Sequence, residues 1–209
     1  MPGSSTPADG LPRPLRLVAR LLLVAVIVLS TLQGLERLIV EPLVPVFGAA
    51  VGILGPQFVV TDSRVIQEET GKVVRFHANL REPMTIAGQV VYPFGSHGIP
   101  DGGYEVTYTL GGVLQYSALL LIIAFAWPAK RAQELMVRLL LCIAFVAALL
   151  TIEVPSTVVA ELWHGVETMV DPSALNVWMI WSRFLMGGGG CALSILLAAL
   201  AISAGRRCS

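Results

Sequence analysis

The sequence predicts a membrane protein: an all-α bundle of four transmembrane helices with a small antiparallel β module in the first extracytoplasmic segment. Of 209 residues, 55% are hydrophobic and only 13% are charged, whereas a soluble domain carries about 25% charged residues. Four apolar runs are long enough to cross a hydrocarbon core of about 30 Å, which takes about 20 helical residues. Between the first two runs the pattern changes to the period-two alternation of strands.

The expected order of segments begins with a disordered cytoplasmic lead at 1–16. The four spans are expected at 17–39, 110–127, 135–152 and 177–204. They are joined by an extracytoplasmic segment at 40–109, a cytoplasmic turn at 128–134 and an extracytoplasmic loop at 153–176, and a cytoplasmic tail follows at 205–209. The first run has a basic front, as a signal peptide does, but no A-x-A cleavage pattern follows it. We therefore expect a retained helix.

The orientation follows from the basic residues near the span ends, since cytoplasmic loops are enriched in Lys and Arg. With both termini cytoplasmic, eight basic residues lie inside: Arg13, Arg16, Arg20, Lys130, Arg131, Arg138, Arg206 and Arg207. Against Asp9 and Glu134 they give +6, and the other six basic and twelve acidic residues give −6. Glu134 also precedes Arg138 by four residues, the favourable order for a helical ion pair.

Residues 42–60 form a fifth apolar run, but its prolines and glycines make a straight helix unfavourable. If it crossed the membrane, five of the basic residues would move outside. We expect instead an interfacial helix at 44–54, lying on or dipping into the outer leaflet.

The β module is expected at 57–108, with strand candidates FVVTDSRVIQ, KVVRFHANL, TIAGQVVYPF and YEVTYT. In the second candidate, Val74, Phe76, Ala78 and Leu80 share one face. A unit of about 50 residues is too small to bury a sufficient core alone, so we expect this face to rest on the 44–54 helix. The polar face, or an open edge, then serves either a partner or only a structural cap.

Arg183 is the basic residue that falls within an apolar run, and residues of this kind are candidates for function. Glu153 is expected at a similar depth, near the outer edge of the membrane. Two readings stay open: a structural ion pair or snorkelling of Arg183, and contact of these residues with a ligand or partner.

Glu161, His164 and Glu167 follow one another at three-residue spacing in the second outer loop. Glu and His at this spacing share a helix face and can ligate a metal, but such sites need ligands from other helices. The trio is thus a weak metal candidate beside the simpler reading of an interfacial amphipathic turn. No cofactor is expected.

Four consecutive glycines, Gly187, Gly188, Gly189 and Gly190, lie within the last span. Gly190 and Ser194 have small-xxx-small spacing, which lets membrane helices approach closely. We expect helix packing here, with a kink or a surface for another protein's helix as alternatives.

The three cysteines, Cys142, Cys191 and Cys208, give no disulfide framework. A thiol site of His164, Arg183 and Cys191 lacks a group to orient the histidine, so no catalytic residue is expected.

The layout of one span, a strand-rich outer segment and three further spans, together with YTLGGVLQYSALLLIIAFAWP at the second span, resembles the small membrane proteins associated with exosortase H, a bacterial protein-sorting transpeptidase system. The resemblance implies a non-catalytic accessory protein in the inner membrane of a Gram-negative bacterium, beside a transpeptidase. Claudin-like proteins share the layout but carry a cysteine pair in the first outer loop, which this chain lacks.

We therefore expect an accessory or scaffold protein whose extracytoplasmic face contacts another membrane protein. Without a basic face, nucleic acid is not an expected partner. The alternative is a small transporter or membrane enzyme with a site around Glu153, Arg183 and His164.

Overall fold

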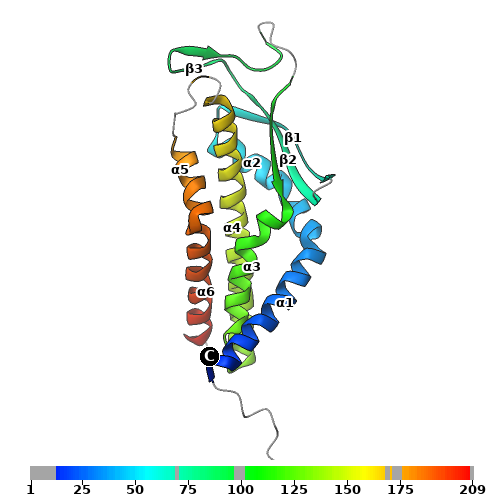
Figure 1. Ribbon diagram of the computed structural model, residues 1–209, viewed down its shortest axis with the longest axis vertical. Helices are drawn as coiled ribbons and strands as arrows, with labels where there is room; N and C mark the ends of the chain where they lie inside the picture. The colour runs from blue at the N-terminus through cyan, green and yellow to red at the C-terminus, as the bar shows by residue number, and fades with distance from the viewer. Residues whose placement is uncertain (1–12, 69–70, 97–101, 168–169, 171–175, 208–209) are drawn as a thin grey trace, which may run out of the picture.

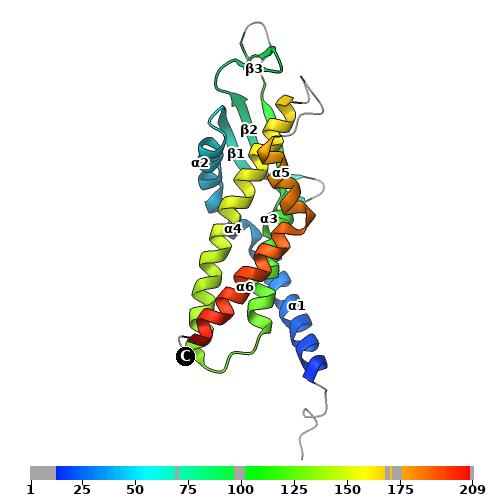
Figure 2. The ribbon, with the colours of Figure 1, turned by 90° about the vertical axis from the view of Figure 1, so that its left-hand side faces the viewer.

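The computed structural model describes residues 13–68, 71–96, 102–167, 170 and 176–207. Helices run along the long axis, and a small sheet lies at one end of them (Figure 1). The start of the first helix, the connection between α3 and α4, and the C-terminus lie at the opposite end (Figures 1 and 2). We call these the sheet end and the opposite end. Most of the expected lead, His97 in its loop, Cys208 and most of 168–175 lie outside the described residues.

The described part is mostly helical and contains three helical segments long and apolar enough to cross a membrane. They are Leu15–Leu54, Ala132–Glu167 and Val177–Arg207. A fourth apolar helix, α3 (Leu110–Ala126), has 17 residues and is therefore about 26 Å long. The expected association with a membrane is consistent with these helices. By length alone, three helical segments are long enough to cross a membrane, and α3 is shorter than the usual crossing helix.

The first of these segments is not one straight helix. It consists of α1 (Arg13–Val40), the 3-10 turn η2 (Glu41–Leu43) and α2 (Val44–Leu54). The bounds of α2 coincide with the expected interfacial helix, and its 11 residues span only about 16 Å, too little to cross a bilayer. Phe47 and Val51 of α2 are buried, whereas α1 contacts α3 and leaves most of its apolar side chains exposed.

Helix α4 (Ala132–Glu167) corrects the expected span at 135–152 and the loop at 153–176. The helix continues through Pro155 for three more turns. Residues at helical spacing on both sides of the proline are fully buried, namely Val154, Val158, Val159, Leu162 and Val166. Their burial offsets the backbone hydrogen bond that a proline removes, a cost of about 3 kcal/mol or more.

The last expected span, 177–204, is bent. It consists of α5 (Val177–Phe184), a π-helical turn η3 (Leu185–Gly189) and α6 (Gly190–Arg207). Within η3, Gly188 has φ +113°, a conformation that favours glycine. The glycine run therefore contains a kink.

The main sheet has three antiparallel strands in the order β1–β2–β5. They are β1 (Phe58–Glu68), β2 (Gly71–Leu80) and β5 (Tyr104–Thr109). The third strand candidate is not part of this sheet. It forms a separate hairpin of β3 (Met84–Ile86) and β4 (Gln89–Val91), because Ala87 and Gly88 both have positive φ and close a two-residue turn.

The apolar face of the sheet is buried against helices. Val74, Phe76, Ala78 and Leu80 of β2 join one core. The same core contains Phe47 and Val51 of α2, Val106 of β5, and Val154, Val158 and Leu162 of α4. The sheet thus rests on α2, as expected, and also on the extension of α4 past the proline.

Candidate functional site

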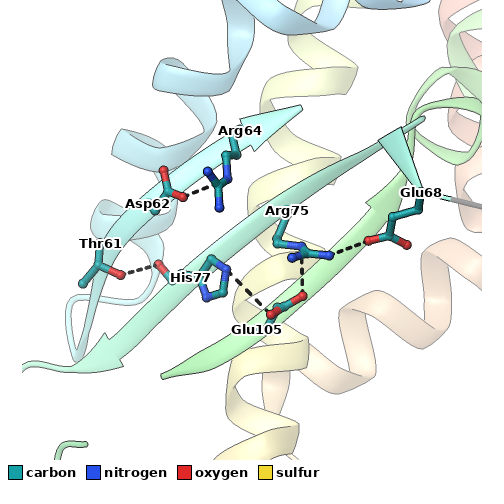
Figure 3. A network of polar contacts seen from close by, with 7 residues as sticks. All are labelled: Thr61, Asp62, Arg64, Glu68, Arg75, His77 and Glu105. Carbon is teal, nitrogen blue, oxygen red and sulfur yellow. Dashed lines mark hydrogen bonds and ion pairs between the residues drawn. The ribbon is translucent and has the colours of Figure 1, made fainter. Parts of the chain in front are cut away.

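The polar face of the sheet carries a chain of ion pairs (Figure 3). In β2, Arg75 Nη2 lies 2.8 Å from Glu68 Oε1, and Arg75 Nε lies 2.9 Å from Glu105 Oε1 of β5. The second carboxylate oxygen of Glu105 lies 3.7 Å from His77 Nε2. One arginine therefore joins the end of β1 to β5 across the middle strand.

Strand β1 extends this network. Arg64 lies directly opposite Arg75 in the register, and like charges in that position repel. Each arginine has its own acid, since Arg64 Nε lies 3.2 Å from Asp62 Oδ2. Thr61 Oγ1 donates to the backbone oxygen of His77 at 3.2 Å. We call Asp62, Arg64, Glu68, Arg75, His77 and Glu105 the charged sheet face.

Further contacts fix the sheet to its surroundings. Asn79 accepts from the backbone nitrogen of Phe94 and donates to its carbonyl, both at 3.0 Å. The Phe94 ring meets Tyr104 edge-on, with centroids 5.2 Å apart. Lys72 Nζ lies 2.8 Å from Glu36 Oε1 of α1. The charged sheet face is therefore held on a platform tied to the helices.

Glu153 is a second unusual feature. Its side chain lies in α4 and the residue is 3% exposed. Neither carboxyl oxygen has a hydrogen-bond partner within the described part of the chain. The neighbouring hydrogen bonds use its backbone instead: Ser156 Oγ donates to the Glu153 carbonyl at 3.0 Å, and Trp181 Nε1 donates to Ser156 Oγ at 3.1 Å.

The groups facing Glu153 are mostly neutral. Tyr108, at the end of β5, has its pKa raised to about 12, first by burial and then by the nearby Glu153 carboxyl, while a hydrogen bond with Thr157 acts in the opposite direction. Thr157 lies one turn beyond Glu153 and is 2% exposed. Tyr116 of α3 also lies close enough to Glu153 for an electrostatic interaction with its carboxyl group. Glu153 therefore lies where β5, α3 and α4 meet.

One of the open readings, an ion pair between Glu153 and Arg183, is not formed in the described part of the chain. Arg183 is exposed on α5, because the buried positions of this short helix are Met179 and Ser182. His164 is exposed and lies 11 residues beyond Glu153, about 16 Å along the helix. The three residues of the alternative transporter or enzyme site are therefore not brought together.

The residues of the weak metal candidate, Glu161, His164 and Glu167, have different surroundings. Glu161 and His164 are exposed, whereas Glu167 is buried at the end of α4 and accepts a hydrogen bond from Asn176 Nδ2 at 3.0 Å. Among the described residues, no three His, Cys, Asp or Glu side chains are placed to hold a metal ion. Glu167 instead links α4 to the start of α5.

The glycine run divides into packed and open positions. A Cβ on Gly190 would lie 2.5 Å from the Tyr116 ring, whereas one on Gly187 would meet nothing within 4 Å. Tyr116 Oη donates to the carbonyl of Leu185 in the π-helical turn at 2.9 Å, and Ser194 Oγ donates to the Tyr116 carbonyl at 2.9 Å. Gly190 thus leaves room for the Tyr116 ring beside the kink, and Ser194 bonds to the backbone of Tyr116.

The opposite end contains the ion pair between Glu134 and Arg138, and it is buried. Arg138 is 0% and Glu134 2% exposed, and Arg138 Nη2 donates to Glu134 Oε1. Arg138 Nη1 donates to the carbonyls of Ala124 and Trp127 at the end of α3, at 2.8 and 2.7 Å. The second oxygen of Glu134 accepts from the backbone nitrogen of Lys130 at 2.9 Å. The four-residue spacing predicted the pair, but no sequence signal indicated that it closes the α3–α4 turn internally.

Comparison with protein-family models, with curated proteins and with solved structures finds no match for this chain. Its function is therefore inferred from the described side chains and from the arrangement of the helices. Two features carry that inference, the charged sheet face and the carboxyl of Glu153.

Proposed function

We propose that the chain is an integral protein of the bacterial cytoplasmic membrane that crosses it four times, with both ends of the chain in the cytoplasm. The arrangement of α3 supports the fourth crossing. It runs from the sheet end to the opposite end between α1, α4 and α6. A membrane crossed by these three helices is therefore crossed by α3 as well, and a 26 Å helix needs only modest thinning of the bilayer.

Charge supports the orientation. Lys130, Arg131, Arg206 and Arg207 are exposed at the opposite end, and exposed basic residues favour the cytoplasmic side. Arg206 lies over the Trp127 ring, 5.5 Å from its centroid, as suits an interfacial aromatic residue. The sheet end then faces out of the cytoplasm.

In this orientation the protein acts as a non-catalytic accessory or scaffold subunit, and its charged sheet face binds a partner protein. The observation that carries this proposal is the ion-pair chain through Arg75 on a sheet fixed by α2 and α4. Such a platform presents charges in set positions, so little side-chain ordering remains to be done on binding.

The mixture of charges favours a protein as the partner. The charged sheet face holds two arginines and three carboxylates within a few residues of one another, a pattern that complements another mixed surface rather than an anionic lipid. A sorting transpeptidase, the partner class implied by the resemblance, is the first candidate. The outer edge of β1 also has no paired strand in the described sheet, which offers strand addition as a second binding mode.

The proposal is tested with photo-crosslinking amino acids placed at Thr107 and Arg64, which are exposed on the polar side of the sheet. A matched control uses Arg131, exposed at the opposite end. Membranes containing the protein at native level should give the same adduct from both sheet positions and none from Arg131. Glu105→Arg, which reverses one charge of the face, should remove that adduct without altering membrane insertion.

Absence of any adduct from the sheet positions, with the protein migrating alone in mild detergent, would refute the proposed role. An adduct that forms from Arg131 and not from the sheet positions would place the partner at the other side of the membrane. Either result would move the search for function away from the sheet.

A further inference from the structure

Glu153 stands apart from the other acidic residues because of what surrounds it. Both of its carboxyl oxygens are buried and unbonded in the described part of the chain. Among the residues that the structure describes, none forms an ion pair with it, and Arg183, the basic residue expected at similar depth, is exposed on α5. A buried ionised carboxylate without a cation or a hydrogen-bond donor is so unfavourable that the group takes up a proton instead.

The ionisable groups on the neighbouring elements do not change this conclusion. Helix α2 has none in its sequence. Strand β5 contributes Tyr108 and α3 contributes Tyr116, both neutral phenols, and the pKa of Tyr108 is raised to about 12, first by burial. On the remaining elements, α4 adds the carboxylate of Glu161 one turn past Thr157, α5 adds exposed Arg183, and α6 adds exposed Cys191.

The lack of space around the Glu153 carboxyl limits what can bind there. Its two oxygens are closed to a water-sized sphere, so a sodium or other metal ion, which needs several oxygen ligands around it, does not fit without opening the joint. A proton needs no such room. The carboxyl thus has the surroundings of a site for a proton.

A polar stripe leads from this carboxyl towards the sheet end. Glu153, Thr157 and Glu161 follow one another at four-residue spacing on α4, one face of the helix. The first two are buried and Glu161 is exposed. The stripe therefore leads from the buried carboxyl to an exposed acid on the same face of the helix.

We propose that Glu153 is a proton-binding site. Its carboxylate takes one proton from the outer solution to form a neutral carboxylic acid, and releases the same proton when that solution becomes alkaline. Because Glu153 lies where β5, α3 and α4 meet, release leaves an uncompensated negative charge in the joint between sheet and bundle. The bound proton therefore holds the sheet on the helices, and alkaline solution loosens it.

The sign of the pH effect follows from proton binding in the two states. Above the usual range of a carboxyl group, the unfolded chain has lost the Glu153 proton while the folded chain keeps it. The folded state then binds more protons, so stability falls as pH rises. Glu153→Gln, a neutral side chain of the same shape, removes this fall.

Infrared spectroscopy of the full chain in lipid vesicles at neutral pH tests the proposal. We expect a carboxylic acid C=O band that disappears on titration to alkaline pH, is lost in Glu153→Gln and is kept in Glu161→Gln. Glu153→Asp should keep the band at a shifted frequency, which identifies the residue even if Glu153→Gln fails to fold. A band unchanged in both Glu153 variants, or no band in the unaltered protein, would overturn the assignment.

Discussion

Two of the buried carboxyl groups of helix α4, Glu134 near the opposite end and Glu153 nearer the sheet, have opposite surroundings. Glu134 is 2% exposed, with each oxygen bonded, one to Arg138 and one to the backbone of Lys130. Glu153 is 3% exposed and has no bonded oxygen in the described part of the chain. Burial is the same, so the partners make the difference.

The difference between Glu134 and Glu153 suggests a structural role for the first and a functional role for the second. At the opposite end, the ion pair closes the α3–α4 turn, and Gly205 of α6 approaches the Glu134 carbonyl so closely that a Cβ there would lie 3.0 Å from it. These contacts bond both carboxylate oxygens of Glu134. At the sheet end, the polar groups exceed what the fold needs. Unbonded Glu153 and the charged sheet face therefore mark this end as the place to look for chemistry and partners.

The largest expected effect is at the opposite end. Arg138→Met leaves Glu134 buried without its cation, and breaking a buried pair in this way costs about 3–5 kcal/mol. It also leaves the carbonyls of Ala124 and Trp127 without their donor. Thermal or denaturant unfolding in detergent measures the loss. Arg131→Met, at an exposed neighbouring position, should change stability by no more than about 0.5 kcal/mol, and equal losses in the two variants would show that the buried pair has no special role.

A smaller loss is expected where the kink receives Tyr116. Gly190→Ala forces a methyl group into the tyrosine ring, and overpacking of this kind costs about 1–3 kcal/mol. Gly187→Ala meets nothing within 4 Å and should be neutral or stabilising, since alanine is favoured over glycine in helices by about 1 kcal/mol. Unfolding of the two variants side by side provides the measurement. If both alanines were tolerated alike, the close approach of α3 to α6 at this point would be wrong.

The smallest stability effect is expected on the charged sheet face. Arg75 and Glu105 are partly exposed, and pairs of this kind contribute about 0.2–1 kcal/mol. A double-mutant cycle with Arg75→Gln and Glu105→Gln measures that coupling. The same variants should weaken partner crosslinking far more than they weaken folding. Large unfolding losses with unchanged crosslinking would turn the face into a purely structural element.

The hydrophobic periodicity of the sequence predicted much of the fold and less of the candidate site. The period-two alternation of β2 and β5 and the apolar run of α3 depend on neighbours in the sequence, and they placed these three elements within a few residues. The extension of α4 past Pro155 depends on a sheet formed by distant residues, which a local breaker signal does not include. For the same reason TIAGQVVYPF read as one strand, although its positive-φ turn folds it back on itself.

The candidate site shows the same limit. Sequence reasoning selected Glu153 as an acidic residue at the membrane edge, and it offered Arg183 as one possible partner from expected depth alone. Which way Arg183 points depends on the rotation of α5 before the kink at Gly188, and this rotation follows from tertiary packing. Arg138 was counted among the flanking charges for the same reason, although it is the most deeply buried charge described.

The most direct test of the central claim, that Glu134 and Glu153 of α4 are buried carboxyl groups in opposite electrostatic states, is a pair of matched variants. Glu134→Gln and Glu153→Gln are compared by thermal unfolding in the same detergent at neutral pH. We predict a clearly lower midpoint for Glu134→Gln, which leaves Arg138 without its counter-charge, and a midpoint within about 2 °C of the unaltered protein for Glu153→Gln. A loss for Glu153→Gln as large as that for Glu134→Gln would contradict the claim, because it would show that Glu153 is an ionised and bonded part of the structure.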